Sequence, residues 1–384
     1  MARVHNHEKA NATTYFSIIV FVVLALFPAV VQATAPKRVL IVYSFGRDFA
    51  PYHVLGQALR TELTQLLKEP VAFQEVSLDV ERGGEPMDER LLVDYLVHRN
   101  RDAPPDLVIS VANPAMLFCL HYRDQLSAGR PLLITGIDRR RLEPVQLGPN
   151  DQAITVTLDF PALAHTVLAL QPDTKTLALV LGSTDLERFW AKEIMRELAP
   201  LGERGITILP PDGASLEQLK QRVASLPSKS AVLYYMFAVG ADGVPHENVL
   251  ALAAIREVSN APVFGMFDDQ LGHGIVGGPL VDARKMGSAT AELAIHMLGN
   301  PDLPGKVMPM PLSKPAFDWR ELQRWNIPES RLPAHAEVRF RPPGLWEEHR
   351  TLILVGSAVV LLQGVLITAL ILQRALRRRA EKTT

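Results

Sequence analysis

The amino-acid sequence predicts an α/β protein of two doubly wound lobes joined by a hinge, with one transmembrane helix near the C-terminus. The first observation is that, from Lys37 onward, short β-branched runs alternate with amphipathic helical patterns, which is typical of parallel sheets. The second is that this alternation is interrupted by a loop rich in Pro and Gly, residues 144–150, and then restarts. The third is an uncharged apolar run from Thr351 to Leu372.

Apolar stretches near both ends of the chain predict its topology. The first, residues 15–31, follows basic residues and precedes small ones, so residues 1–35 read as a cleavable signal peptide; an uncleaved signal anchor is the alternative. The second, residues 351–372, is long enough to cross the hydrocarbon layer as a helix, and a basic tail, residues 373–384, follows it. Because positive charge stays on the cytoplasmic side, the globular part is expected in the periplasm, anchored in the cytoplasmic (inner) membrane.

The composition restricts the class of partner. The chain has 384 residues, of which 21% are charged, and its formal net charge is -1, so no nucleic-acid partner is expected. Its single cysteine, Cys119, lies in an apolar, helix-like run, which predicts a buried core thiol and excludes an intramolecular disulfide. The residues between the two apolar ends are enough for one large domain or two modest ones.

The strands of the two lobes follow one another in a regular order. Strands of the first lobe are predicted at RVLIVYS, VAFQEVSL, DLVISV and PLLITGI, with leucines at helical spacing between them. Strands of the second lobe are predicted at ITVTL, TLALVLG, GITIL, AVLYYMF and PVFGMF. We therefore expect one lobe at residues 37–150 with 275–312, and the other at residues 151–274, with a hinge near residues 151–158.

The segment after the lobes contains many prolines and has no strong period. It reads as lobe-covering strands followed by a linker to the membrane, residues 313–350. The exported domain as a whole is thus expected to span residues 36–312.

Several of these runs together carry a family resemblance. They are KRVLIVYSFGRDFAPY, DLVISVANPA, PLLITGID and APVFGMFDDQLGHGIVGGPLVDARKMGSATAELAIHML. On these residues the sequence resembles the type I periplasmic-binding-protein class, and more closely the ABC-transporter substrate-binding family, whose domains also form the sensor region of bacterial sensor histidine kinases. The resemblance implies two Rossmann-like lobes that close on a small-molecule ligand. In the kinase relatives a membrane helix leads into signalling modules, whereas this sequence ends at Thr384, so either a separate signalling or transporter partner or a longer parent protein is expected.

Candidate ligand-binding residues follow from the position of the strand ends. In an open α/β sheet the ligand lies beyond the carboxyl ends of the strands. The rule selects Ser44, Phe45, Arg47, Asp48, Asn113 and Gly136, with Asp138 beside it, in the first lobe. It selects Ser183, Asp185, Phe189, Tyr235, Phe267 and Asp268 in the second lobe. We expect Phe45, Tyr235 and Phe267 to sandwich a small organic solute that polar groups orient.

Each of these residues also has a purely structural interpretation. Ser183 and Asp185 are suited to capping a helix, and Tyr235 to packing in the core. Arg47 with Asp48 is suited to clamping a carboxylate or phosphate, or is a solvated pair on a loop.

The motifs leave two classes of function open. Because no HExxH, Gly-x-Ser-x-Gly or clustered cysteine motif appears, we predict no catalytic residue, metal or cofactor. The leading hypothesis is a membrane-anchored solute-binding or sensor protein, and the membrane helix favours sensing over transport. An exported enzyme that uses the same cleft is the alternative. Gln363, with the Gly364 and Thr368 spacing, allows either a homodimer through the membrane helix or a lone span.

Overall fold

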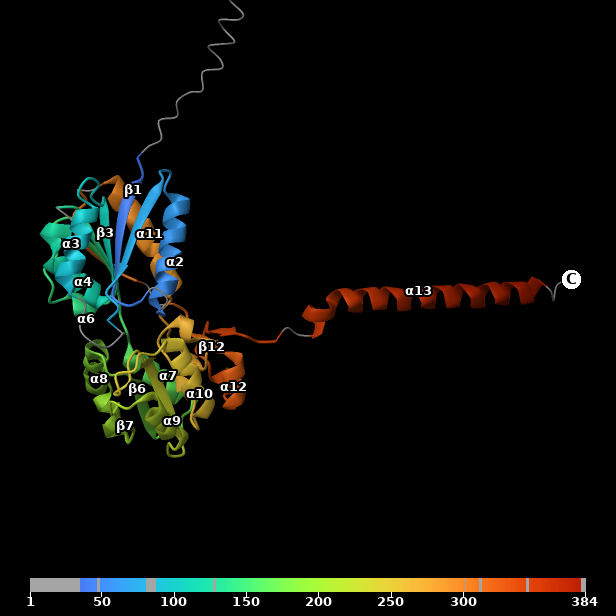
Figure 1. Cartoon of the computed structure of the whole chain (residues 1–384). Helices are drawn as coiled ribbons and strands as arrows, with labels where there is room; N and C mark the ends of the chain where they lie inside the picture. Colours follow the sequence, from blue (N-terminus) through green and yellow to red (C-terminus); the bar gives the residue numbers. More distant parts are fainter. Residues whose placement is uncertain are drawn as a thin grey trace, which may run out of the picture.

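The computed structural model describes residues 35–46, 49–80, 88–126, 129–300, 302–310, 313–342 and 345–380. This part of the chain folds into two α/β lobes, one above the other in Figure 1, and a long C-terminal helix that extends away from both. Residues 1–34 of the predicted signal peptide lie outside the described residues.

The first lobe, the upper one in Figure 1, is built on a six-stranded parallel sheet. In spatial order its strands are β11 (Lys306–Pro309), β5 (Gln152–Val156), β4 (Leu132–Asp138), β3 (Leu107–Val111), β1 (Lys37–Tyr43) and β2 (Val71–Ser77). Successive side chains of a strand point to opposite faces, so each face buries alternate residues. Val39 and Ile41 pack under α2 (Tyr52–Leu66) and α11 (Ala283–Gly299).

The opposite face of this sheet is covered by shorter helices. Leu40 and Val42 of β1 share a cluster of buried side chains with residues of these helices, such as Leu96 and Met116. The helices are α3 (Glu89–Arg99), α4 (Asn113–His121), α5 (Arg123–Leu126) and α6 (Arg139–Leu142). Burial on both faces explains why the strands read as continuous apolar runs.

The crossing of α2 and α11 depends on a glycine. A Cβ added to Gly287 would lie 2.3 Å from the carbonyl oxygen of Leu55 and 2.7 Å from the Cβ of Ala58. Gly287→Val is therefore expected to lower the free energy of unfolding by about 1–3 kcal/mol, the usual range for overpacking. Urea unfolding of the full chain checks this, with Gly299→Ala as the control, because a Cβ at Gly299 meets nothing within 4 Å. Equal stability of both variants would contradict the close crossing.

The second lobe has a four-stranded parallel sheet with the same kind of strand order. The order is β7 (Thr207–Leu209), β6 (Thr176–Leu181), β8 (Ser230–Met236) and β9 (Val263–Phe264). One face is covered by α9 (Leu216–Ala224) and α10 (Asn248–Val258), the other by α7 (Phe160–Leu170) and α8 (Asp185–Leu198), and a short 3-10 helix, η1 (Ala199–Arg204), follows α8. In both sheets the first strand lies between the second and the third, so each lobe is doubly wound, as predicted.

The boundary between the lobes differs from the predicted one. The run ITVTL was expected to open the second lobe, but β5 pairs with β4 on one side and with β11 on the other, inside the first sheet. Asp151, just before β5, is buried and paired with Arg123 of α5. The chain therefore crosses to the second lobe after β5, at residues 157–159, and the loop at residues 144–150 is internal to the first lobe.

Much of the predicted linker is folded. Residues 316–339 form β12 (Ala316–Asp318), α12 (Trp319–Arg324), the 3-10 helix η3 (Glu329–Arg331) and β13 (Glu337–Arg339), and β12 pairs with β10 (Gly277–Gly278). Phe317, Leu322 and Ile327 are buried in the core. Glu321 binds Arg256 of α10, which attaches this segment to the second lobe. The apolar residues of this segment are widely spaced and have prolines between them. They therefore show neither a helical nor a strand period that would indicate where the folded part ends.

The C-terminal helix, α13 (Leu345–Ala380), has non-helical backbone at His349. From His349 to Arg374 its mean hydropathy reaches 2.4, and the helix is long and apolar enough to cross a membrane. The predicted span, residues 351–372, lies within it. The Thr368 hydroxyl donates a hydrogen bond to the Gly364 carbonyl within the helix, and dimerisation through this face stays a prediction.

Candidate functional site

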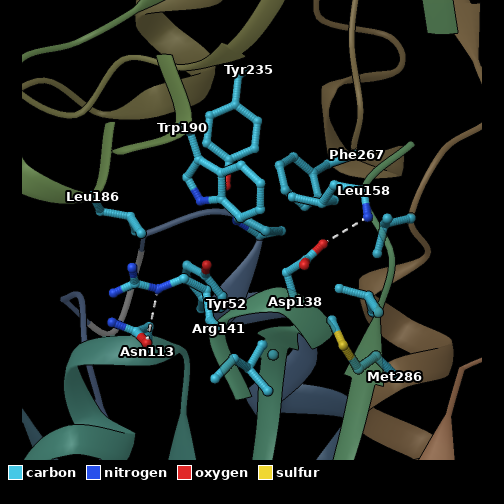
Figure 2. Close-up of a pocket in the computed structure, with 15 residues that line it drawn as sticks. Tyr52, Asn113, Asp138, Arg141, Leu158, Leu186, Trp190, Tyr235, Phe267 and Met286 are labelled. Carbon is cyan, nitrogen blue, oxygen red and sulfur yellow. Dashed lines mark hydrogen bonds between the residues drawn. The ribbon is translucent and has the colours of Figure 1, made fainter. Parts of the chain in front are cut away.

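A pocket lies between the two lobes, at the carboxyl ends of both sheets and beside the point where the strand order reverses (Figure 2). The first lobe and its helix α11 contribute Pro51, Tyr52, Asn113, Gly136, Ile137, Asp138, Arg141, Val156 and Met286. The second lobe and the crossings contribute Leu158, Leu186, Trp190, Tyr235, Phe267 and Val281. The free space between these side chains is about 30 Å³, which holds water but not an organic solute. An organic molecule can enter only if the lobes or their side chains separate.

One wall of the pocket is aromatic and belongs to the second lobe. The ring centroids of Trp190 and Tyr235 lie 5.7 Å apart, and those of Tyr235 and Phe267 are also 5.7 Å apart. In Figure 2 these three rings stand together above the pocket. Such tilted pairs present both ring faces and edges to a flat or apolar solute.

The facing wall belongs to the first lobe and carries Tyr52. Its ring stacks on Phe45 with the centroids 5.1 Å apart, and Phe45 stacks in turn on Phe49. Phe45 does not line the pocket, whereas Tyr52, on which it stacks, does. The expected sandwich thus has Tyr52 where the sequence suggested Phe45.

The structure brings together some of the predicted site residues. Asn113, Gly136, Tyr235 and Phe267 line the pocket. Phe189 lies beside it, with its ring centroid 4.2 Å from the guanidinium carbon of Arg141.

Other predicted residues have different surroundings. The Ser44 hydroxyl donates to the Val111 carbonyl and accepts from the Ala115 amide, so it joins β1, β3 and α4. Asp185 is exposed and pairs with Arg188. Asp268 accepts a hydrogen bond from the amide of Ala283, at the start of α11.

The remaining predicted residues give less information. The hydroxyl of Ser183 is buried and has no hydrogen-bond partner in the part of the chain that the structure describes. Arg47 and Asp48 lie outside the described residues. A ligand-binding role for these residues stays a prediction.

A carboxylate and a guanidinium fix the crossing between the lobes. Arg140 donates to Asp138 from Nε and from Nη2, both at 2.8 Å, and from its backbone amide at 2.9 Å. The other main-chain partner is Leu158, whose amide donates to Asp138 and whose carbonyl accepts from Arg140. Asp138 is 5% exposed and its oxygens accept four hydrogen bonds, so its charge is fully compensated inside the protein.

Two arginines of α6 reach the second lobe. Arg140 binds Glu197 of α8 through Nη1, and its guanidinium carbon lies 4.9 Å from the ring centroid of Trp190. Arg141 donates from Nε to the Asn113 side chain at 3.2 Å and lies over the ring of Phe189. The contacts with Glu197, Trp190 and Phe189 exist only when α6 and α8 are close, so they belong to the closed arrangement of the lobes, whereas the bond to Asn113 lies within the first lobe.

Sequence reasoning missed Tyr52, Arg140, Arg141 and Trp190. A helical signal was available for Trp190, because it follows Leu186 by four residues on α8 and therefore shares its face. Tyr52 begins the first helix after the loop that follows β1. The arginines belong to the run Arg139 to Arg141, which reads as a solvated surface patch.

Neither a cluster of metal ligands nor a reactive thiol is found among the described residues. Among them no group of three or more His, Cys, Asp or Glu side chains could hold a metal ion. Cys119 is buried, as predicted, and its burial raises the pKa of the thiol to about 12, so it is not a nucleophile at neutral pH.

Comparison with solved structures defines the class of fold. The chain is similar to the ABC domain in complex with L-Trp from Streptococcus pneumonia, with a TM-score of 0.59 at 17% identity, over 79% of this chain and 100% of that one. A conserved domain protein from Vibrio cholerae has a TM-score of 0.58 at 14% identity, over 79% and 99%. CD0873, a substrate binding protein with adhesive properties from Clostridium difficile in its ligand-free, open structure, has a TM-score of 0.53 at 12% identity, over 79% and 98%.

At these identities the likeness shows the fold alone. The fold is that of the type I periplasmic binding proteins, as the sequence predicted. No protein-family model and no curated protein matches the sequence.

Proposed function

We propose that this chain is a membrane-anchored, extracytoplasmic solute-binding protein that closes its lobes on a small molecule and passes the signal or the solute to a partner. The main support for this proposal is the pocket between the lobes, which has aromatic walls from both sides and lies at the carboxyl ends of both sheets. Two structural neighbours support the proposal, since one holds L-Trp and another is a substrate binding protein.

Closure follows from contacts that need both lobes. A solute between Tyr52 and Trp190 touches the first and the second lobe at once, so it binds the closed form better than the open form. The bond from Arg140 to Glu197 and the stacking of Arg141 on Phe189 join the two lobes, so they stabilise the closed form with or without solute. The ligand then shifts an equilibrium that these contacts already bias.

The apolar helix α13 supports the proposed topology. It would cross the cytoplasmic membrane with its basic end inside and hold the lobes in the periplasm. Such a tether suits a receptor better than a freely diffusing transport subunit, so we favour sensing through a partner protein, a sensor kinase for example.

Binding and closure can be measured on the full chain purified in detergent. A metabolite library is screened by thermal shift, hits are measured by calorimetry, and compaction of the lobes is followed by X-ray scattering. A saturable, micromolar or tighter ligand that compacts the protein is expected. If no compound binds, the proposal fails; if a bound compound is chemically converted, the chain is an enzyme.

The variant Glu197→Gln tests the contribution of the cross-lobe bond. It removes the ion pair with Arg140, which is partly buried and therefore worth about 1 kcal/mol, so ligand affinity should fall about fivefold. Glu193→Gln on the same helix is the control, because among the described residues Glu193 pairs with Arg196 and not with Arg140. Equal affinities of the two variants would show that the bond does not stabilise closure.

A further inference from the structure

We propose that the solute of this pocket is an amphipathic anion, an apolar or aromatic body that carries a carboxylate, and that Arg141 receives the carboxylate. The inference rests on the proposed solute-binding function and names the ligand class for the same site. It follows from the charges of the lining residues and from the way in which the guanidinium is held.

The charges that line the pocket are unequally compensated. Asp138 and Arg141 are the lining residues with full charges among those that the structure describes. Asp138 accepts four hydrogen bonds from Arg140 and Leu158 and has no capacity left for a ligand. Arg141 forms no ion pair with a described carboxylate, and burial alone lowers the pKa of its guanidinium. Within the part of the chain that the structure describes, the pocket therefore presents one uncompensated positive charge to a solute.

The guanidinium of Arg141 is held in place while its outer edge stays open. Its Nε donates to Asn113, the first residue of α4, and its face lies 4.2 Å from the ring centroid of Phe189. Its two terminal nitrogens donate no hydrogen bond to any described residue. Figure 2 shows it at one edge of the pocket, below Leu186 and beside the aromatic wall. A planar fork that is already oriented and stacked matches a carboxylate with little loss of entropy.

The rest of the lining suits the body of the solute and, among the described residues, offers no free carboxylate to a cation. Tyr52 faces Trp190, Tyr235 and Phe267, and aliphatic side chains close the remaining surface. The side-chain oxygen of Asn113 already accepts from Arg141. An amine would thus meet an unpaired guanidinium and a saturated carboxylate, whereas a carboxylate would compensate a charge that burial makes costly.

The test uses pairs of probes that differ in charge but hardly in shape. Indole-3-acetate is compared with indole-3-acetamide, and phenylacetate with phenylacetamide, by calorimetry on the full chain in detergent. A bond to a charged group contributes enough for the carboxylates to bind about 10- to 100-fold more tightly than the amides. In Arg141→Gln this preference should disappear, because the loss of the contact with Phe189 affects acids and amides alike, whereas the loss of the charge affects only the acids.

The control variant is Arg139→Gln on the same helix, because Arg139 is exposed, pairs with Glu143 and does not line the pocket. It should keep the full preference. Arg141→Lys keeps the charge without the planar fork, so it should retain part of the preference, and it preserves the test if Arg141→Gln does not fold.

Two results would overturn the inference and leave the proposed function standing. One is equal binding of acids and amides, or a preference that survives in Arg141→Gln. The other is binding of neutral or cationic library compounds with no binding of any carboxylate. Failure of every small molecule to bind would instead refute the solute-binding function itself.

Discussion

Glu187→Ala is expected to lower the free energy of unfolding by about 3–5 kcal/mol, because it leaves the buried amide of Ala238 and the partly buried amide and hydroxyl of Thr184 without their acceptor. Glu187 is fully buried at the start of α8. Its Oε1 accepts from the amides of Ala238 at 2.7 Å and Gly182 at 3.2 Å, and its Oε2 accepts from the amide and the hydroxyl of Thr184. Of the four donors, the amide of Gly182 also donates to the Met236 carbonyl, at 3.1 Å, and keeps that bond in the variant.

The loss of the hydrogen bonds to Glu187 should also affect the aromatic wall of the pocket. Gly182 follows β6 and Ala238 follows β8, so Glu187 ties together the strand ends that carry the aromatic wall. Trp190 is on the same helix as Glu187, and Tyr235 is in β8. We therefore expect the variant to loosen the second lobe before it affects the first, which hydrogen exchange of the two lobes would show.

Urea unfolding of the full chain measures the effect. Glu187→Gln keeps the shape but places an amide nitrogen against donors, so an intermediate loss is expected. Glu193→Ala is the control on the same helix, since Glu193 pairs with Arg196 on the surface. A loss below 1 kcal/mol in Glu187→Ala would mean that the network contributes little to the stability of the lobe.

The sequence was sufficient to predict the fold class because the helical spacing of its leucines and the apolar runs of its strands are both pronounced. Leucines at helical spacing from Leu55 to Leu63 and apolar runs such as residues 107–111 correspond to α2 and β3. Local periodicity does not tell which sheet a strand joins, and this is why β5 was assigned to the wrong lobe. Its neighbours β4 and β11 are set by tertiary packing, and β11 is far away in the sequence.

The candidate site could be predicted only in part for the same reason. Asn113, Gly136, Tyr235 and Phe267 follow from the rule that ligands lie at strand ends, and all four line the pocket. Arg141 does not follow, because its role depends on Phe189, which comes from the other lobe. A pairing between residues so distant in the chain leaves no local pattern.

The stability of the protein is also expected to depend on pH through a single buried carboxyl group, that of Asp269. Both oxygens of Asp269 are buried, and neither accepts a hydrogen bond from another described residue. Burial first, and the charge of Asp268 second, raise the pKa of Asp269 to about 7, with Glu247 acting in the same direction. In the unfolded chain the same group has its ordinary pKa of about 3.9.

The sign of the effect follows from proton uptake. Between about pH 4 and pH 7 the folded protein holds a proton on Asp269 that the unfolded chain has released, so stability falls as the pH rises through this window. A pKa shift of this size lowers the free energy of unfolding at pH 8 by an amount on the order of 4 kcal/mol. Below pH 4 both states are protonated and the cost is absent.

Asp269→Asn removes the ionisable group and keeps the shape, so it should stabilise the protein at pH 8 and flatten the decline between pH 5 and pH 8. Urea unfolding at several pH values measures both effects, with the exposed Asp185→Asn as the control. The decline should not vanish, because burial also raises the pKa of Glu187 and of Asp268. If Asp269→Asn and the parent chain lose stability in parallel over this range, Asp269 is ionised in the folded protein and its pKa is not raised.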